Sequence, residues 1–88
     1  MIIRRQGDWL AAKVGDELVM MSAAKDLYLG LTEVGARIWE LIETPTTLEA
    51  ICARLQAEFD VTAQACRADV EAFLAELQVD GAVSIDQN

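Results

Sequence analysis

The chain has 88 residues, 53% of them hydrophobic and only one of them proline, a composition typical of one folded domain spanning residues 1–88. A domain of this size has little room for a deep, enclosed active site. Its net charge of −8 arises entirely after residue 31, since residues 1–31 carry four basic and four acidic side chains and residues 32–88 carry three and eleven. The acidic half would repel a duplex or an anionic membrane, so neither nucleic acid nor membrane is expected as a partner.

Three short apolar segments, at residues 9–14, 17–21 and 26–31, predict strands of an antiparallel meander. The dipeptide Gly15-Asp16 separates the first two segments and is typical of a two-residue hairpin, because glycine accepts the positive φ of such a turn. The third segment alternates with period two. One face of it carries Leu27, Leu29 and Leu31, and the other carries Tyr28 and Gly30.

Three helices are expected after the strands. Thr32 is the predicted N-cap of the first helix, which ends at Thr44-Pro45. Thr46 and Glu49 have the spacing of a capping box that opens the second helix, and Thr62 is the predicted cap of the third. The third helix ends at Asp80-Gly81, and residues 83–85 can add a short last strand.

The two cysteines, Cys52 and Cys66, are expected as small buried thiols on apolar helix faces, with a disulfide as the alternative. Without histidine, neither a metal site of usual ligand number nor a CxxC redox pair can form, so no metal and no cofactor are expected. No apolar run has the length of a signal peptide core or of a membrane span, which predicts a cytoplasmic protein.

This order of elements predicts an α+β, winged helix-turn-helix-like domain: a three-stranded antiparallel sheet followed by three helices. A DNA-binding regulator is therefore an alternative function. However, Arg67 is the only basic residue of the predicted third helix, and acidic residues surround it. An enzyme is not expected, since general acid-base work would fall to carboxylates that follow the polar helix faces.

The third strand predicts a different use of the fold. As an edge strand it would present unpaired backbone groups at residues 27–29, to which an extended peptide could bind as a further strand. The alternative is that the chain's own terminal strand closes this edge. The strand pattern does not separate the two, and an open edge would also allow two copies of the chain to pair as a homodimer.

Residues 28–42 read YLGLTEVGARIWELI, and the stretches TLEAICARLQAEFDV and CRADVEAFLAELQVDGAV follow. This extended pattern, over residues 8–84, resembles the PqqD family of small peptide chaperones. Members of that family act as recognition elements for the leader segments of ribosomally synthesised, post-translationally modified peptides (RiPPs). The pattern is closer to the stand-alone members of lasso-peptide biosynthesis than to those that serve radical enzymes.

The resemblance implies a non-catalytic adaptor that binds a precursor's leader as an added strand, between the third strand and the third helix. Its partners would be the precursor peptide and a maturation enzyme, either a leader peptidase or a radical SAM enzyme. Arg67 would pair with an acidic leader residue or remain a solvated charge. The implied peptide-binding residues are Asp26, Leu27, Tyr28 and Leu29 on the strand and Arg67, Val70, Glu71 and Leu74 on the helix.

Overall fold

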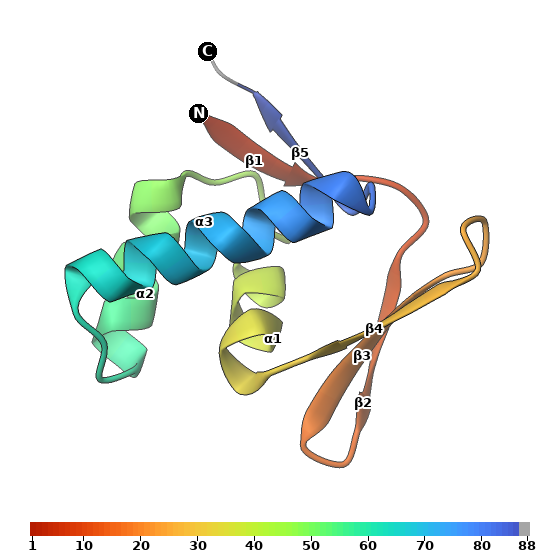
Figure 1. The fold of residues 1–88 in the computed structure, drawn as a ribbon, viewed down its shortest axis with the longest axis horizontal. Helices are drawn as coiled ribbons and strands as arrows, with labels where there is room; N and C mark the ends of the chain where they lie inside the picture. Colours follow the sequence, from red (N-terminus) through yellow and green to blue (C-terminus); the bar gives the residue numbers. More distant parts are fainter. Residues whose placement is uncertain (87–88) are drawn as a thin grey trace.

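The structure, a computed structural model, describes residues 1–86 and has the predicted α+β architecture (Figure 1). Three helices pack together on one side of the molecule, and a three-stranded sheet extends from them. A second, two-stranded sheet joins the two ends of the described chain. The elements are β1 (Ile2–Arg5), β2 (Leu10–Val14), β3 (Glu17–Ser22), β4 (Leu27–Leu31), α1 (Glu33–Leu41), α2 (Leu48–Glu58), α3 (Ala63–Val79) and β5 (Val83–Asp86).

The predicted meander is confirmed: β2, β3 and β4 form an antiparallel sheet in that order. The hairpin between β2 and β3 turns at Gly15, whose φ of 65° lies in the left-handed region that glycine enters without strain. Met20 pairs with Ala11 on one side and with Leu29 on the other. One face of the sheet therefore carries Ala11, Met20 and Leu29, and residues of this face reach the core.

The first strand, β1, was not predicted, and it decides where the C-terminal strand goes. β5 pairs with β1, Arg4 opposite Ser84, and not with β4. Ile3 is fully buried and exchanges two backbone hydrogen bonds with Thr46, of 2.7 and 3.1 Å. The predicted last strand is thus confirmed, but the alternative that it closes the edge of the meander is wrong.

Strand β1 also completes the end of α1, a helix without a basic residue in its last turn. The Arg5 guanidinium donates to the carbonyl oxygen of Trp39 and lies 4.2 Å from the centroid of the Trp39 ring. A cation at a helix C-terminus interacts favourably with the helix dipole, and the ring face adds a cation–π contact. Burial lowers the pKa of Arg5 from its usual value.

The helix ends follow the predicted chemistry with one correction. Thr32 and Thr62 cap α1 and α3, as predicted, by accepting from the amides of Gly35 and Ala65. The cap of α2 is Thr47, which accepts from Ala50, so the capping box predicted at Thr46 is wrong by one residue. The backbone of Thr46 pairs with Ile3 instead, which holds this residue in the bridge to β1.

The third helix ends in a Schellman motif. The amide of Gly81 donates to the carbonyl of Gln78 (3.1 Å) and that of Ala82 to the carbonyl of Leu77 (2.8 Å). Gly81 has the left-handed φ of 76° that this motif requires. The predicted end at Asp80-Gly81 is confirmed, and it turns the chain directly into β5.

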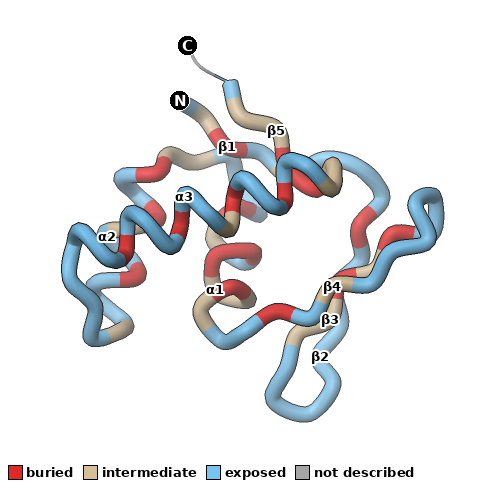
Figure 2. The backbone as a smooth tube through the Cα atoms, viewed as in Figure 1, coloured by how far each residue is buried: buried red, intermediate tan, exposed pale blue. Residues whose placement is uncertain are grey.

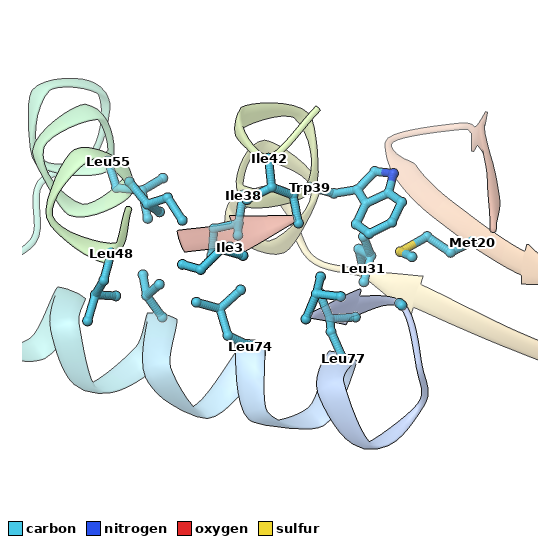
Figure 3. Packing of buried hydrophobic residues seen from close by; sticks show 14 of the residues in the cluster. Ile3, Met20, Leu31, Ile38, Trp39, Ile42, Leu48, Leu55, Leu74 and Leu77 are labelled. Atoms are coloured by element: carbon cyan, nitrogen blue, oxygen red, sulfur yellow. The ribbon is translucent and has the colours of Figure 1, made fainter. Parts of the chain in front are cut away.

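One hydrophobic core joins the helices, β1 and the inner face of the meander (Figure 3). In it Leu74 and Leu77 of α3 lie beneath α1 and α2, and Trp39 lies next to Leu31 and Met20. The meander itself is largely exposed, β2 along its whole length (Figure 2). None of the helices in residues 1–86 has the length and apolar character that crossing a membrane requires.

The cysteines lie where α2 meets α3. Cys66 is buried, Cys52 is partly buried, and both are free thiols, so the predicted alternative of a disulfide is not formed. The Cys66 Sγ lies 3.9 Å from the carbonyl oxygen of Cys52. Burial, followed by the hydrogen bond with Cys66, raises the pKa of Cys52 to about 11. Residues 1–86 contain no group of acidic or cysteine side chains that could hold a metal ion.

Candidate peptide-binding site

The outer edge of β4 is open. Within residues 1–86, β4 pairs only with β3, on one of its two edges. The other edge of residues 27–31 therefore presents backbone N–H and C=O groups without a neighbouring strand. An extended peptide can satisfy such groups by pairing as a further strand.

The loop that leads into β4 is held by Asp8. Its carboxylate accepts from the Ser22 hydroxyl (2.5 Å) and from the amide of Ala24 (3.0 Å). The hydrogen bond from Ser22, followed by that from Ala24, keeps the pKa of Asp8 below its usual value. The chain then enters β4 through Asp26, whose φ of 54° is left-handed, a conformation that aspartate tolerates better than most residues.

A groove lies between β4 and the C-terminal half of α3. Leu29 lines it from the strand side, and the hollow measures about 510 Å³. Val79 is 86% exposed, which is unusual for a large apolar side chain and leaves it free for contact. We call this site the β4–α3 groove, and its lining residues are Leu29, Ala75, Glu76, Val79 and Asp80.

One stripe of α3 continues from the groove toward α1. The spacing of i, i+4, i+7 and i+11 places Asp69, Phe73, Glu76 and Asp80 on the same side of the helix. Phe73 and Asp69 line a second, mostly apolar pocket of about 320 Å³, between α1, α2 and α3. The apolar side chains around this pocket are Val34, Ile38, Leu55, Phe59, Val61, Val70 and Phe73. The groove and this pocket thus lie along the same helix flank.

The predicted helix residues occupy other positions. Val70 and Leu74 are 0% and 3% exposed, so both side chains pack in the core, and neither lines the β4–α3 groove. That they contact a leader stays a prediction. Arg67 and Glu71 lie on the flank opposite the stripe, because helix periodicity turns them away from Glu76. They pair with each other at 2.9 Å, and Arg67 also lies 3.8 Å from Glu49 of α2.

The predicted strand residues are at the open edge, and their side chains alternate between the two faces. Leu29 points toward α3, and Leu27 shares its face by register. Tyr28 lies on the opposite face and is 70% exposed, so its side chain does not contact the groove. Asp26 stands at the entrance of the strand. Of the predicted residues, only Leu29 lines the β4–α3 groove. There it meets side chains of α3 and its C-cap that the sequence analysis did not single out: Ala75, Glu76, Val79 and Asp80.

A small α+β unit that keeps one strand edge open beside a helix groove has the geometry of a peptide-recognition domain. The profile of the family described as "Coenzyme PQQ synthesis protein D (PqqD)" matches residues 17–83. The match covers most of the chain, so the chain belongs to the PqqD family, and the resemblance noted from its sequence is confirmed.

Two solved structures have this fold. One is described as TbiB1 in complex with the TbiA(beta) leader peptide; it is 27% identical, with a TM-score of 0.84 over 97% of this chain and 99% of that one. The other is described as lasso peptide synthetase B1 complexed with the leader peptide, 17% identical, with a TM-score of 0.83 over 94% of this chain and 98% of that one. The second likeness concerns the fold alone. Among curated proteins, none matches the chain significantly.

Proposed function

We propose that this protein is a RiPP recognition element: a non-catalytic domain that binds the leader segment of a precursor peptide and presents it to a maturation enzyme. The leader would pair with the open edge of β4 and lie against α3. The observation that carries the proposal is the free strand edge beside the β4–α3 groove. The description of TbiB1 as a complex with a leader peptide supports it.

The strand edge and the helix side of the site would contribute to leader binding in different ways. Backbone pairing with β4 would supply affinity that depends little on the peptide's sequence. Specificity would come from side chains that enter the groove over Leu29 and Val79 and the apolar pocket beside Phe73. The proposed peptide-binding residues are accordingly Asp26, Leu27, Tyr28 and Leu29, the first three through their backbone, with Ala75, Glu76 and Val79 from the helix.

The stripe on α3 adds a charge preference. Asp69, Glu76 and Asp80 have no ion-pair partner among residues 1–86, whereas Arg67 is already paired with Glu71. A leader with a basic residue next to its apolar anchors would complement these carboxylates. The two roles expected for Arg67, pairing with an acidic leader residue or remaining a solvated charge, stay predictions.

The receiving enzyme would be a leader peptidase of lasso-peptide biosynthesis, because the sequence pattern resembles the stand-alone members that serve such enzymes. A radical SAM enzyme is the alternative that the family resemblance implies. The adaptor would raise the effective concentration of the precursor at that enzyme. A cytoplasmic location and pairing of two copies through the open edge remain predictions.

The proposal is tested by titrating the ¹⁵N-labelled protein with the leader half of the precursor encoded beside it. We expect amide shifts in residues 27–31 and 75–80, and slower hydrogen exchange in β4, because new strand hydrogen bonds protect its outward amides. Shifts without protection in β4 would contradict strand addition. The absence of any shift at saturating peptide would reject this leader as the ligand.

A pair of variants tests the groove. Val79→Asp replaces an apolar contact with a carboxylate that the bound leader would bury. We expect leader affinity to fall about tenfold or more, because a lost apolar contact and an unpaired charge each oppose binding. Val79 is highly exposed, so the fold should not change. The matched control is Gln78→Asp, an equally acidic change at an exposed position on the flank of the same helix that carries Arg67 and Glu71. Equal affinities for both variants would place the leader elsewhere.

A further inference from the structure

The face of the meander that points away from the helices is apolar and uncovered. Strand register places Leu10, Met21 and Tyr28 in one row across the three strands, and Ala12, Val19 and Gly30 in the next. Leu10, Val14 and Tyr28 are 70%, 64% and 70% exposed. We call this surface the outer face, and its residues are Leu10, Ala12, Val14, Val19, Met21, Tyr28 and Gly30.

Both ends of the outer face are acidic. At one end lies a hollow of about 590 Å³, and Leu10, Met21, Tyr28, Asp8 and Asp26 are among the residues that line it. Glu17, paired with Val14, stands at the other end. The nearest lysines do not belong to this face. Lys13 alternates to the inner face. The Lys25 side chain packs so closely on Gly81 that a Cβ atom on that glycine would lie 2.9 Å from the Lys25 Nζ.

This charge pattern limits the kinds of partner that can bind the outer face. If two copies stacked their outer faces, carboxylates would meet carboxylates in either orientation, because both ends are acidic and no basic side chain of the face could compensate. Nucleic acid and anionic lipid surfaces are repelled for the same reason. A protein surface with an apolar centre and basic residues at its margin complements the outer face in both respects.

The position of the outer face relates it to the leader. A leader strand added at β4 would extend the sheet by one strand, and alternate leader side chains would then emerge next to Tyr28 and Gly30. A protein bound on the outer face would therefore contact the captured leader directly. Among the partners that the proposed function requires, only the receiving enzyme needs that contact.

We infer that the outer face is the docking surface for the maturation enzyme, which contributes an apolar patch with a basic margin. In the hollow, an arginine or lysine of the enzyme would lay its aliphatic stem on Leu10 and Met21 and bring its cation to the Tyr28 ring and the Asp26 carboxylate. This inference rests on the proposed function and assigns the enzyme and the leader to different surfaces of one sheet.

The test uses the purified chain, a fluorescently labelled lasso-peptide leader that it binds, and the leader peptidase that cleaves that leader. Leu10→Asp and Val14→Asp alter β2, two strands away from the β4 edge. We expect each variant to bind the leader within about twofold of the parent, but to need at least tenfold more protein to stimulate leader cleavage. Val79→Asp should give the reverse pattern, with weakened leader binding, and Gln78→Asp should change neither quantity.

Unchanged stimulation by Leu10→Asp and Val14→Asp would overturn the docking surface while leaving the proposed function intact. If the parent chain fails to bind the leader, the proposed function fails first, and that is seen before any enzyme is added. Sedimentation gives the remaining outcome: a dimer of the parent that Val14→Asp dissociates would assign the outer face to a second copy and overturn the inference. A charge-reversal variant, Glu17→Lys, should also impair stimulation, because it repels the enzyme's basic margin.

Discussion

Asp8 lies outside β4, the proposed binding strand, but its side chain holds the loop that leads into that strand. Its carboxylate joins Ser22, at the end of β3, to the loop before β4 through two hydrogen bonds. The residue lies in a stretch between strands, where sequence patterns gave no reason to single it out. Its role depends on a contact with residues 14 to 16 positions later in the chain, which no local periodicity encodes.

We predict that Asp8→Ala lowers the thermal stability at pH 7 and that the difference from the parent shrinks in acid. Since the folded-state pKa of Asp8 lies below its ordinary value of 3.8, the carboxylate stabilises the fold fully above that value. This contribution is lost as the pH falls through the folded-state pKa. Melting curves of both proteins between pH 7 and pH 2 measure it. A difference that stayed constant over that range would contradict an ionised hydrogen-bond acceptor.

Cys52 gives a second prediction at this scale. With a pKa of about 11, its thiolate fraction at pH 8 is about a hundredfold below that of a thiol with the ordinary value of 9.0. We expect Cys52 to react with iodoacetamide at pH 8 roughly 100-fold more slowly in the folded protein than in urea at the same pH. Mass spectrometry of time-quenched samples gives both rates. Rapid alkylation of the folded protein would contradict the burial of this thiol.

At the scale of elements, the caps show how closely local chemistry determines helix starts. The pattern Thr46-x-x-Glu49 is a valid capping box, but Thr47 also has a favourable side chain and is the cap in the structure. The choice is made by β1, which pairs with the backbone of Thr46 and holds it in extended geometry. A strand from the other end of the chain thus moves the helix start by one residue.

We predict that Thr47→Ala lowers the free energy of unfolding by about 1 kcal/mol, the usual effect of losing an N-cap hydroxyl. The lost interaction is the 3.1 Å hydrogen bond from the Ala50 amide. Thr46→Ala is the matched control and should change stability by less than about 0.5 kcal/mol, because Thr46 bonds to Ile3 through its backbone and its side chain caps no helix. Urea unfolding measures the stability of both variants. An equal loss of stability in the two would indicate that the Thr46 side chain also caps the helix.

The two-stranded sheet of β1 and β5 gives the clearest test of an unpredicted element. Ile3→Ala should cost about 2–5 kcal/mol, because Ile3 is fully buried and its truncation leaves a cavity between β1 and the helices. Ile2 is only partly buried in the same strand, so Ile2→Ala should have a clearly smaller effect. Denaturant unfolding measures both. Similar losses would mean that β1 is held by its backbone pairing rather than by its core contact.

These elements also show why the fold was predictable and the helix side of the site was not. The meander and the helices follow from local periodicity and turn residues, which the sequence contains directly. The apolar residues Val70, Leu74 and Leu77 predict a buried face on α3. Both flanks beside that face are polar, and the sequence makes them equally plausible as walls of the groove. Only the packing of α3 against α2 turns Arg67 away from β4 and places Glu76 and Val79 beside it.

At the scale of the whole molecule, charge and apolar surface are separated. The acidic excess lies on the helical half, whereas the outer face of the meander is apolar between acidic ends. The β4–α3 groove lies at the boundary between the two. This arrangement allows a leader, held mainly by backbone and apolar contacts, to be bound at one edge while the adjacent sheet face remains free for a second protein.

The separation leads to a prediction about salt. Backbone pairing and apolar anchors carry no net charge, and each ion pair with the exposed stripe on α3 contributes about 1 kcal/mol or less. We therefore expect leader affinity to fall by less than about tenfold between 50 and 500 mM NaCl, as measured by fluorescence anisotropy. Glu76→Gln should weaken this salt dependence further by removing one carboxylate of the stripe.

A nucleic-acid-binding regulator would instead lose about 10³–10⁵ in affinity between 50 and 200 mM salt. A loss of that size for any ligand of this chain would favour the winged-helix regulator over strand capture, because only many simultaneous charge contacts produce so steep a dependence.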